Sequence, residues 1–181
     1  NKWPDRIIVF FVTLITSMPS FVIATLLLYF FCIKLGVVQA FNSESNMVLL
    51  PVISLSLSPM AYITRLTKTS MLDALGQDYI RTAKAKGVSQ AKVIFVHGLR
   101  NALIPVITYV GPMIGGILTG SMVIESIFNI GGLGSKFVSC ITNRDYTMIM
   151  ATTLFLAVIM VFANLITDIV YKLIDPRISL D

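Results

Sequence analysis

Four long stretches of this chain contain no charged residue, and they limit its possible folds more than any other feature. They occupy residues 7–33, 45–64, 101–124 and 146–167. An α-helix rises about 1.5 Å per residue, so roughly 20 residues cross the hydrocarbon core of a bilayer. Strands of membrane barrels instead alternate apolar and polar residues, which these stretches do not do. The sequence therefore predicts an all-α polytopic membrane bundle, a single domain over residues 1–181, with spanning helices at about 7–33, 45–64, 101–124 and 146–170.

The composition excludes several other classes of protein. Hydrophobic residues make up 56% of the 181 residues and charged residues 13%, whereas soluble domains average about 25% charged. Disordered chains combine low hydrophobicity with high charge, which is the reverse of this composition. The two cysteines (Cys32 and Cys140) and the single histidine (His97) lack the spacing of a disulfide framework or a metal site. We expect neither a metal nor a cofactor.

Lysines and arginines gather in one connecting segment, and they predict how the chain is oriented. Segment 65–100 holds seven of the fourteen basic residues. If this segment is cytoplasmic, eleven basic residues lie inside and three outside (Lys34, Lys136 and Arg144), because four spans alternate. The reverse orientation would violate the positive-inside rule. We therefore predict a multi-pass protein of the cell (inner or plasma) membrane, surrounded by lipid, with both ends cytoplasmic. The net charge of +5 needs no nucleic acid to explain it.

A short helix is predicted within this cytoplasmic segment. Asp78 is a residue type that caps helix N-termini, and Gly87 suits the left-handed position that follows a helix end. Residues 79–86 between them form about two turns, and Ser89 caps another short stretch. One face carries Ile80, Ala83 and Gly87, while the basic residues Arg81, Lys84 and Lys86 spread over the rest. The pattern leaves two interpretations open: a helix that rests on anionic lipid headgroups, or an element on which a partner docks closely, at the face of the small residues Ala83 and Gly87.

Prolines and glycines distinguish the apolar runs from one another. Pro19 predicts one kink in the first run, and Pro51 and Pro59 predict a locally interrupted backbone in the second. The third run carries small residues at helical spacing, namely Gly111, Gly115, Gly116 and Gly120. Such glycines allow another helix to approach closely. They predict either packing within this chain or a pore-side or dimer face.

Several motifs resemble one family of transport proteins. Asp78-Tyr-Ile-Arg-Thr-Ala-Lys-Ala-Lys-Gly87 and Leu99-Arg-Asn-Ala-Leu-Ile-Pro105 resemble the cytoplasmic signature loop of ABC-importer permeases, and more narrowly that of the dipeptide/oligopeptide/nickel group. Further matches follow in order: Glu125-Ser-Ile-Phe128 with Gly132-Leu-Gly134, Asn143-Arg-Asp-Tyr146 and Asp175-Pro-Arg177. Members of this family have about six spans, and the four spans here resemble the last four. We therefore expect this sequence to lack one or two N-terminal helices.

The resemblance implies the transmembrane domain of a type I ABC importer and a role for the short helix. In such permeases a coupling helix docks on an ATPase and transmits its movement to the spanning helices. The residues that match this helix are Tyr79, Arg81, Thr82, Ala83, Lys84, Ala85, Lys86 and Gly87. The implied partners are a homologous second permease subunit, two cytoplasmic ABC ATPase subunits and an extracytoplasmic solute-binding protein.

The same resemblance implies peptides as the cargo, with nickel or another small solute as the alternative. The sequence itself singles out no substrate-binding residue. No G-x-x-x-x-G-K-[ST] nucleotide motif occurs in it. We therefore expect a transport subunit that is not an enzyme and that relies on partner chains for ATP hydrolysis.

Two other functions fit the apolar runs less well. A secondary transporter driven by an ion gradient places ionisable groups near mid-membrane, whereas Glu125 and Asp168 lie at the ends of their runs. An intramembrane enzyme needs a nucleophile and a base at depth, but His97 lies in the cytoplasmic segment. The sequence favours the permease.

Overall fold

The computed structural model describes residues 3–38, 48–118 and 120–174, and every regular element in these ranges is helical. In chain order the elements are α1 (Trp3–Ser17), α2 (Ser20–Leu27), the π-helix η1 (Leu28–Lys34), α3 (Leu49–Gly76), α4 (Asp78–Ala85), α5 (Gln90–Lys92), the π-helix η2 (Val93–Gly98), α6 (Leu99–Leu118), α7 (Met122–Ile127), α8 (Leu133–Thr142) and α9 (Tyr146–Ile174). The predicted all-α class is confirmed.

Three of these helical segments are long and apolar enough to cross a membrane. They are α3, the segment that begins at Gln90 and includes α6, and α9. The bent pair Trp3–Ser17 and Ser20–Lys34 passes the same test if its two halves form one span. Three of the stretches predicted as spans thus correspond to long apolar helices, and the stretch predicted at 7–33 corresponds to the bent pair.

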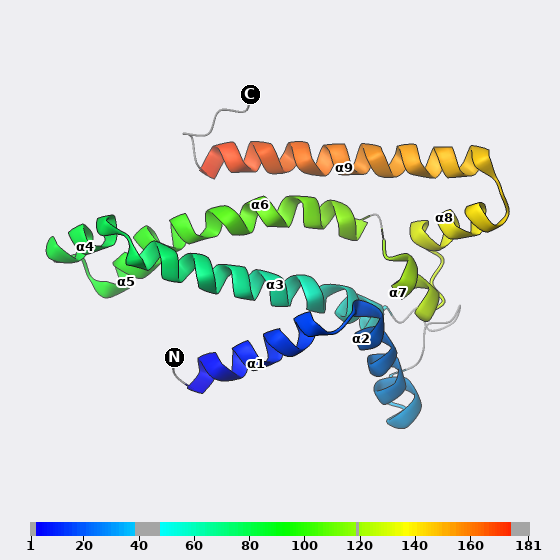
Figure 1. Cartoon of the computed structure of the whole chain (residues 1–181), viewed down its shortest axis with the longest axis horizontal. Coiled ribbons are helices and arrows are strands. Elements are labelled where there is room, and N and C mark those ends of the chain that lie inside the picture. Colours follow the sequence, from blue (N-terminus) through cyan, green and yellow to red (C-terminus); the bar gives the residue numbers. More distant parts are fainter. Residues whose placement is uncertain (1–2, 39–47, 119, 175–181) are drawn as a thin grey trace.

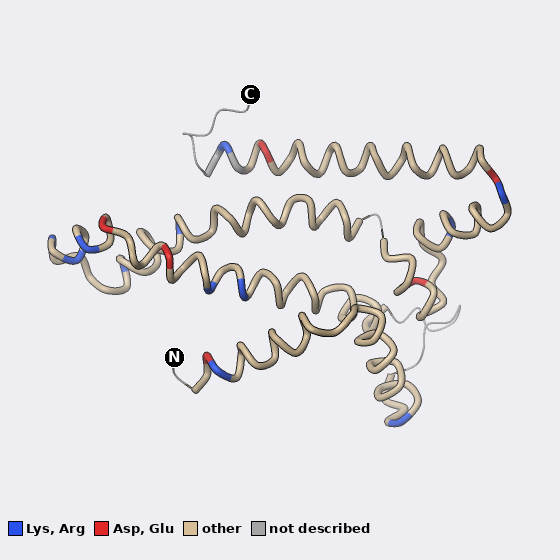
Figure 2. The backbone as a smooth tube through the Cα atoms, in the orientation of Figure 1, with Lys and Arg blue, Asp and Glu red and all other residues tan. Residues whose placement is uncertain are grey.

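The three long helices lie side by side (Figure 1). Helix α6 packs between α3 and α9, and α1 lies against α3. The connection through α4 and α5 lies at one end of the bundle, and α7 and α8 lie at the other. The start of α1 and the last turn of α9 both point toward the α4–α5 end. The middle of α6 and α9 carries no charged residue, whereas α3 carries the basic residues Arg65 and Lys68 along its length (Figure 2).

Helix α3 is longer and more regular than the sequence predicted. It continues through Arg65 and Lys68 to Gly76, so segment 65–100 is not a loop throughout. Pro51 lies in the first turn of α3, where its missing N–H is tolerated, and Pro59 lies inside the helix without ending it. The predicted interruption of this span is therefore wrong. The buried Ser54 hydroxyl is satisfied within the helix, since its Oγ donates to the Leu50 carbonyl at 2.8 Å.

The kink predicted at Pro19 is present, but it is a sharp break. Helix α1 ends at Ser17 and α2 begins at Ser20, with a bend of 105° between the two halves. Proline lacks the N–H donor and disfavours helical backbone in the residue before it, so the chain turns here. An ion pair between Asp5 and Lys68 joins α1 to α3.

Some residues used in the sequence analysis lie outside the described residues. They are residues 45–47 of the second predicted span, Lys2 and the Asp175-Pro-Arg177 motif.

Candidate functional site

The short helix α4 begins and ends close to where the sequence predicted. Its first residue is Asp78, while the capping position belongs to Gln77, whose extended backbone (φ −74°, ψ 155°) separates α4 from α3. At the other end Gly87 is left-handed, with φ +75°. The Val88 N–H donates to the Ala83 carbonyl at 3.2 Å, and the Gly87 N–H donates to the Lys84 carbonyl at 3.0 Å. This is a Schellman cap, and the predicted conformation of Gly87 is confirmed.

One face of α4 is buried within the chain itself. Ile80 and Ala83 pack with Val93 of η2, and Leu75 and Val88 close the cluster. Ile80 and Val93 have no exposed surface, and Ala83 is 8% exposed. The expectation that Ala83 belongs to an open docking face is therefore wrong. The apolar side of an amphipathic helix is buried against the nearest apolar surface, and here the first turn of η2 provides that surface.

The opposite face of α4 is open to solvent and basic. Five of the residues predicted to couple to a partner are exposed on it: Arg81, Thr82, Lys84, Ala85 and Lys86. Arg81 Nη1 lies 3.4 Å from Asp78 Oδ1, and both side chains are more than three-quarters exposed, so this pair contributes little stability. A Cβ added at Gly87 meets no atom within 4 Å. The reachable surface is therefore a small patch that carries three cations.

Contacts attach α4 and the adjoining η2 to both neighbouring long helices, α3 and α6. The Tyr79 hydroxyl accepts a hydrogen bond from Asn101 Nδ2 of α6 at 3.1 Å. On the other side Gly98 brings η2 close to α3, since a Cβ at Gly98 would lie 3.1 Å from Leu75 Cδ2 and from Met71 Cε. Neither contact was foreseen from the sequence. Together with the buried cluster, these contacts attach the α4–η2 region to both α3 and α6.

The four glycines predicted to pack against another helix have three different surroundings. A Cβ at Gly111 would overlap Thr167 of α9, and one at Gly115 would lie 2.7 Å from Met160 Sδ of the same helix. A Cβ at Gly116 meets nothing within 4 Å. Gly120 lies beyond the end of α6 with φ +81°, so its placement on the helix was wrong. Of the four, Gly111 and Gly115 face a helix of this chain.

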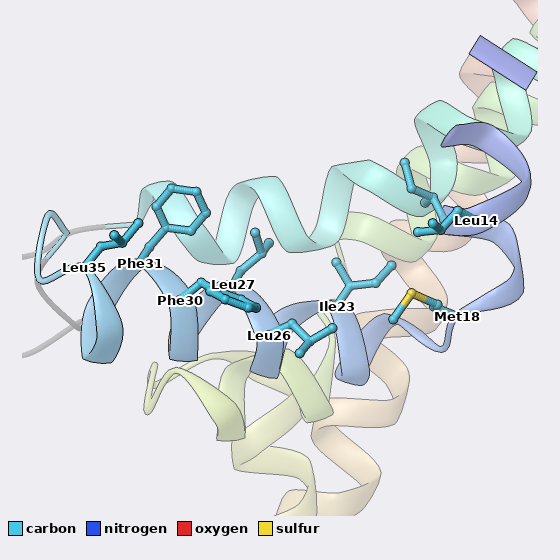
Figure 3. Close-up of a pocket in the computed structure, with 9 residues that line it drawn as sticks. Leu14, Met18, Ile23, Leu26, Leu27, Phe30, Phe31 and Leu35 are labelled. Atoms are coloured by element: carbon cyan, nitrogen blue, oxygen red, sulfur yellow. The ribbon is translucent and has the colours of Figure 1, made fainter. Parts of the chain in front are cut away.

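A hollow on the inner side of the α1–α2 bend lacks the groups that a peptide requires (Figure 3). Its volume is about 510 Å³, and its nine lining side chains are all apolar. They include Leu14, Ile23 and Phe30. Sites for polar ligands contain a few placed hydrogen-bonding groups, and none of these nine side chains provides one. This hollow is suited to apolar material such as a lipid chain or another helix.

The amino-acid sequence matches a family model along nearly its whole length. Residues 1–180 match the family model described as "Binding-protein-dependent transport system inner membrane component". The chain belongs to this family. Its motifs from Asp78 to Gly134 lie within the matched residues.

Individual relatives from several bacteria carry transport names. The chain is 51% identical to the dipeptide transport system permease protein of Bacillus subtilis (strain 168), over 91% of this chain and 54% of that protein. It is 45% identical to the oligopeptide transport system permease protein of Haemophilus influenzae, over 98% of this chain and 59% of that protein. It is 39% identical to the glutathione transport system permease protein of Escherichia coli (strain K12), over 98% of this chain and 58% of that protein. The chain thus spans somewhat more than half the length of these relatives.

Proposed function

We propose that this chain forms part of a permease subunit of an ATP-driven importer, and that α4 is its coupling helix. The observation that carries the proposal is the attachment of α4. Its inner face is buried against η2, Tyr79 is bonded to Asn101 on α6, and its outer face is exposed and basic. A helix held in this way transmits force from a partner to α3 and α6 instead of bending. The proposed partners are a second permease subunit, two ABC ATPases and an extracytoplasmic binding protein.

Peptides are the proposed cargo. The relatives above are named for dipeptide, oligopeptide and glutathione transport, and these three cargos share peptide amides and terminal charges. The second candidate, nickel, would be favoured by a cluster of metal-ligating side chains. Within the described part of the chain no three His, Cys, Asp or Glu residues form such a group.

Uptake of labelled peptide by the full-length permease assembled with its partner subunits tests this function. We expect ATP-dependent uptake that is lost when the ATPases carry an inactive nucleotide site and that excess nickel does not compete with. Uptake that continues without ATP and instead collapses when the ion gradient is dissipated would show a secondary transporter.

The orientation of the chain gives a separate prediction. Lys86 lies just after α4 and Lys136 lies on α8, at opposite ends of the bundle, and both are exposed. We expect a cysteine at position 136 to react with a membrane-impermeant maleimide in intact cells, and a cysteine at position 86 to react only after the cells are opened. Rapid labelling at 86 and none at 136 in intact cells would reverse the topology.

A further inference from the structure

A carboxylate is buried at the end of the bundle opposite α4, and the proposed function does not yet use it. Glu125 on α7 is 9% exposed, and it is the one charged residue buried in the described part of the chain. Its Oε2 atom accepts a hydrogen bond from the backbone N–H of Ser135 at 2.7 Å. Ser135 lies in the first turn of α8. The carboxylate therefore caps a helix to which it does not belong, where an N–H otherwise lacks a partner and the helix dipole favours negative charge.

Three glycines make the space that this carboxylate occupies. A Cβ at Gly132 would overlap the Glu125 carboxylate, and one at Gly120 would overlap its Oε1 atom. A Cβ at Gly134 would lie 3.2 Å from Oε2 and 2.7 Å from the Met122 backbone nitrogen. The spacing of Gly132 and Gly134 thus has a steric cause. Any side chain at these positions meets either Glu125 or the backbone of α7.

The rest of α7 is anchored to a different part of the molecule. Ile124, next to Glu125, and Phe128, which follows α7, are buried in a cluster with Ala24 of α2 and Leu50 of α3. In the other direction α8 leads directly into α9, whose first turn is capped by Asp145 through the Met148 N–H at 3.0 Å. The Glu125–Ser135 bond therefore joins the α2–α3–α7 cluster to the α8–α9 arm.

We propose that Glu125 is a positioning residue for transport, which holds α8 and the start of α9 on the α7 cluster so that they move together. The inference rests on the proposed permease function. A hydrogen bond to a buried charge is among the stronger contacts in a protein, and breaking it leaves the charge without a partner in a poorly hydrated site. Loss of the bond loosens the attachment of α8 to α7 at this end of the bundle. The packing of α9 on α6 at Gly111 and Gly115 is unaffected, so the start of α9 no longer moves with the α7 cluster.

The test compares two neighbouring glycines, with Cys140 on α8 as a native reporter. Gly132→Ala displaces the carboxylate, and since Gly132 has φ −119°, alanine fits its backbone without strain. Gly131→Ala is the matched control, because a Cβ there meets nothing within 4 Å. Maleimide labelling of half-buried Cys140 is followed by peptide mapping in the full-length, detergent-purified complex. We expect Gly132→Ala to label at least about tenfold faster than the parent, the lower limit for losing a hydrogen bond to a charged group, and Gly131→Ala to label at the parent rate.

Variants of the carboxylate show whether Gly132→Ala acts through it. Glu125→Ala should label as fast as Gly132→Ala, and the double variant should label no faster than either single variant, since the added methyl group then has no carboxylate to displace. Additive rates would show that Gly132→Ala acts elsewhere. Glu125→Gln keeps an oxygen that can accept the Ser135 N–H bond, so it should return labelling most of the way to the parent rate.

Peptide uptake by the same variants completes the test. We expect the maximal rate of uptake to fall for Gly132→Ala and Glu125→Ala, with the peptide concentration for half-maximal uptake unchanged, and to recover in Glu125→Gln. Parent-like labelling of both Gly132→Ala and Glu125→Ala overturns the proposed contact. Faster labelling with unchanged uptake overturns its role in transport. If the parent complex itself transports no peptide, the permease proposal fails, while the labelling rates still decide whether Glu125 holds α8.

Discussion

Gly111→Ala should nearly abolish peptide uptake and lower the amount of assembled complex in the membrane. The Cβ that alanine adds would overlap the Oγ1, Cγ2 and Cβ atoms of Thr167 on α9. Rotation of the threonine side chain cannot relieve an overlap that includes its own Cβ, so α6 and α9 must move apart. Overpacking of this kind costs about 1–3 kcal/mol or more, and in a membrane close helix packing is itself a main source of stability. Membrane levels and thermal stability in detergent measure the effect.

The same helix provides the control and a graded series. Gly116→Ala should behave like the parent, because its Cβ meets nothing within 4 Å. Gly115→Ala should be mild, since the nearest atom is the flexible Met160 Sδ, whereas Gly115→Leu should be severe. Adding Thr167→Gly to Gly111→Ala should recover part of the loss by removing the side chain that is struck. Equal stability of the Gly111→Ala and Gly116→Ala variants would contradict close packing of α6 on α9.

Features that depend on a few neighbouring residues were predicted well from the sequence. The apolar runs located the long helices because lipid imposes the same requirement on every spanning residue. Gly87 was assigned to the left-handed region from its residue type and its place after a short helix, and it has φ +75°. A kink was predicted at Pro19, but the 105° bend between the two halves was not, because the angle depends on what each half packs against.

Features that depend on partners distant in the sequence were missed. Ala83 was expected to face outward, but Val93 lies against it once the chain reverses after Gly87. Glu125 was interpreted as the charged end of an apolar run, and its burial follows from Gly132 and Gly134 folding over it. The Gly-Leu-Gly sequence did indicate a close contact, because a glycine that is not needed for a positive φ usually leaves space for a neighbouring group. The sequence alone did not identify what occupied that room.

Because Ala83 is buried, the decisive test of coupling must substitute a residue on the opposite side of α4. An α-helix turns about 100° per residue, which places Ala85 on the side away from Ile80 and Ala83. Ala85 is exposed, so a large side chain there leaves the inner cluster intact and projects toward any docked partner. We expect Ala85→Trp to reduce peptide uptake at least about tenfold, because a bulky group at the centre of an interface costs more than about 1.4 kcal/mol. Membrane levels should stay normal, and the ATPases should co-purify poorly.

Two further variants and one binding measurement distinguish lost docking from misfolding and from contact with lipid. Ala85→Ser, which adds little volume, should transport like the parent. Ala83→Trp should instead lower the stability of the permease itself, because Ala83 is packed with Ile80 and Val93 and a tryptophan does not fit among them. A helix that only rests on lipid headgroups predicts the reverse for Ala85→Trp, since tryptophan is favourable at a membrane interface. Co-purification of the ATPases in detergent decides between docking and lipid contact, because no lipid surface remains there. If Ala85→Trp retains its ATPases in full, they do not dock on this face of α4.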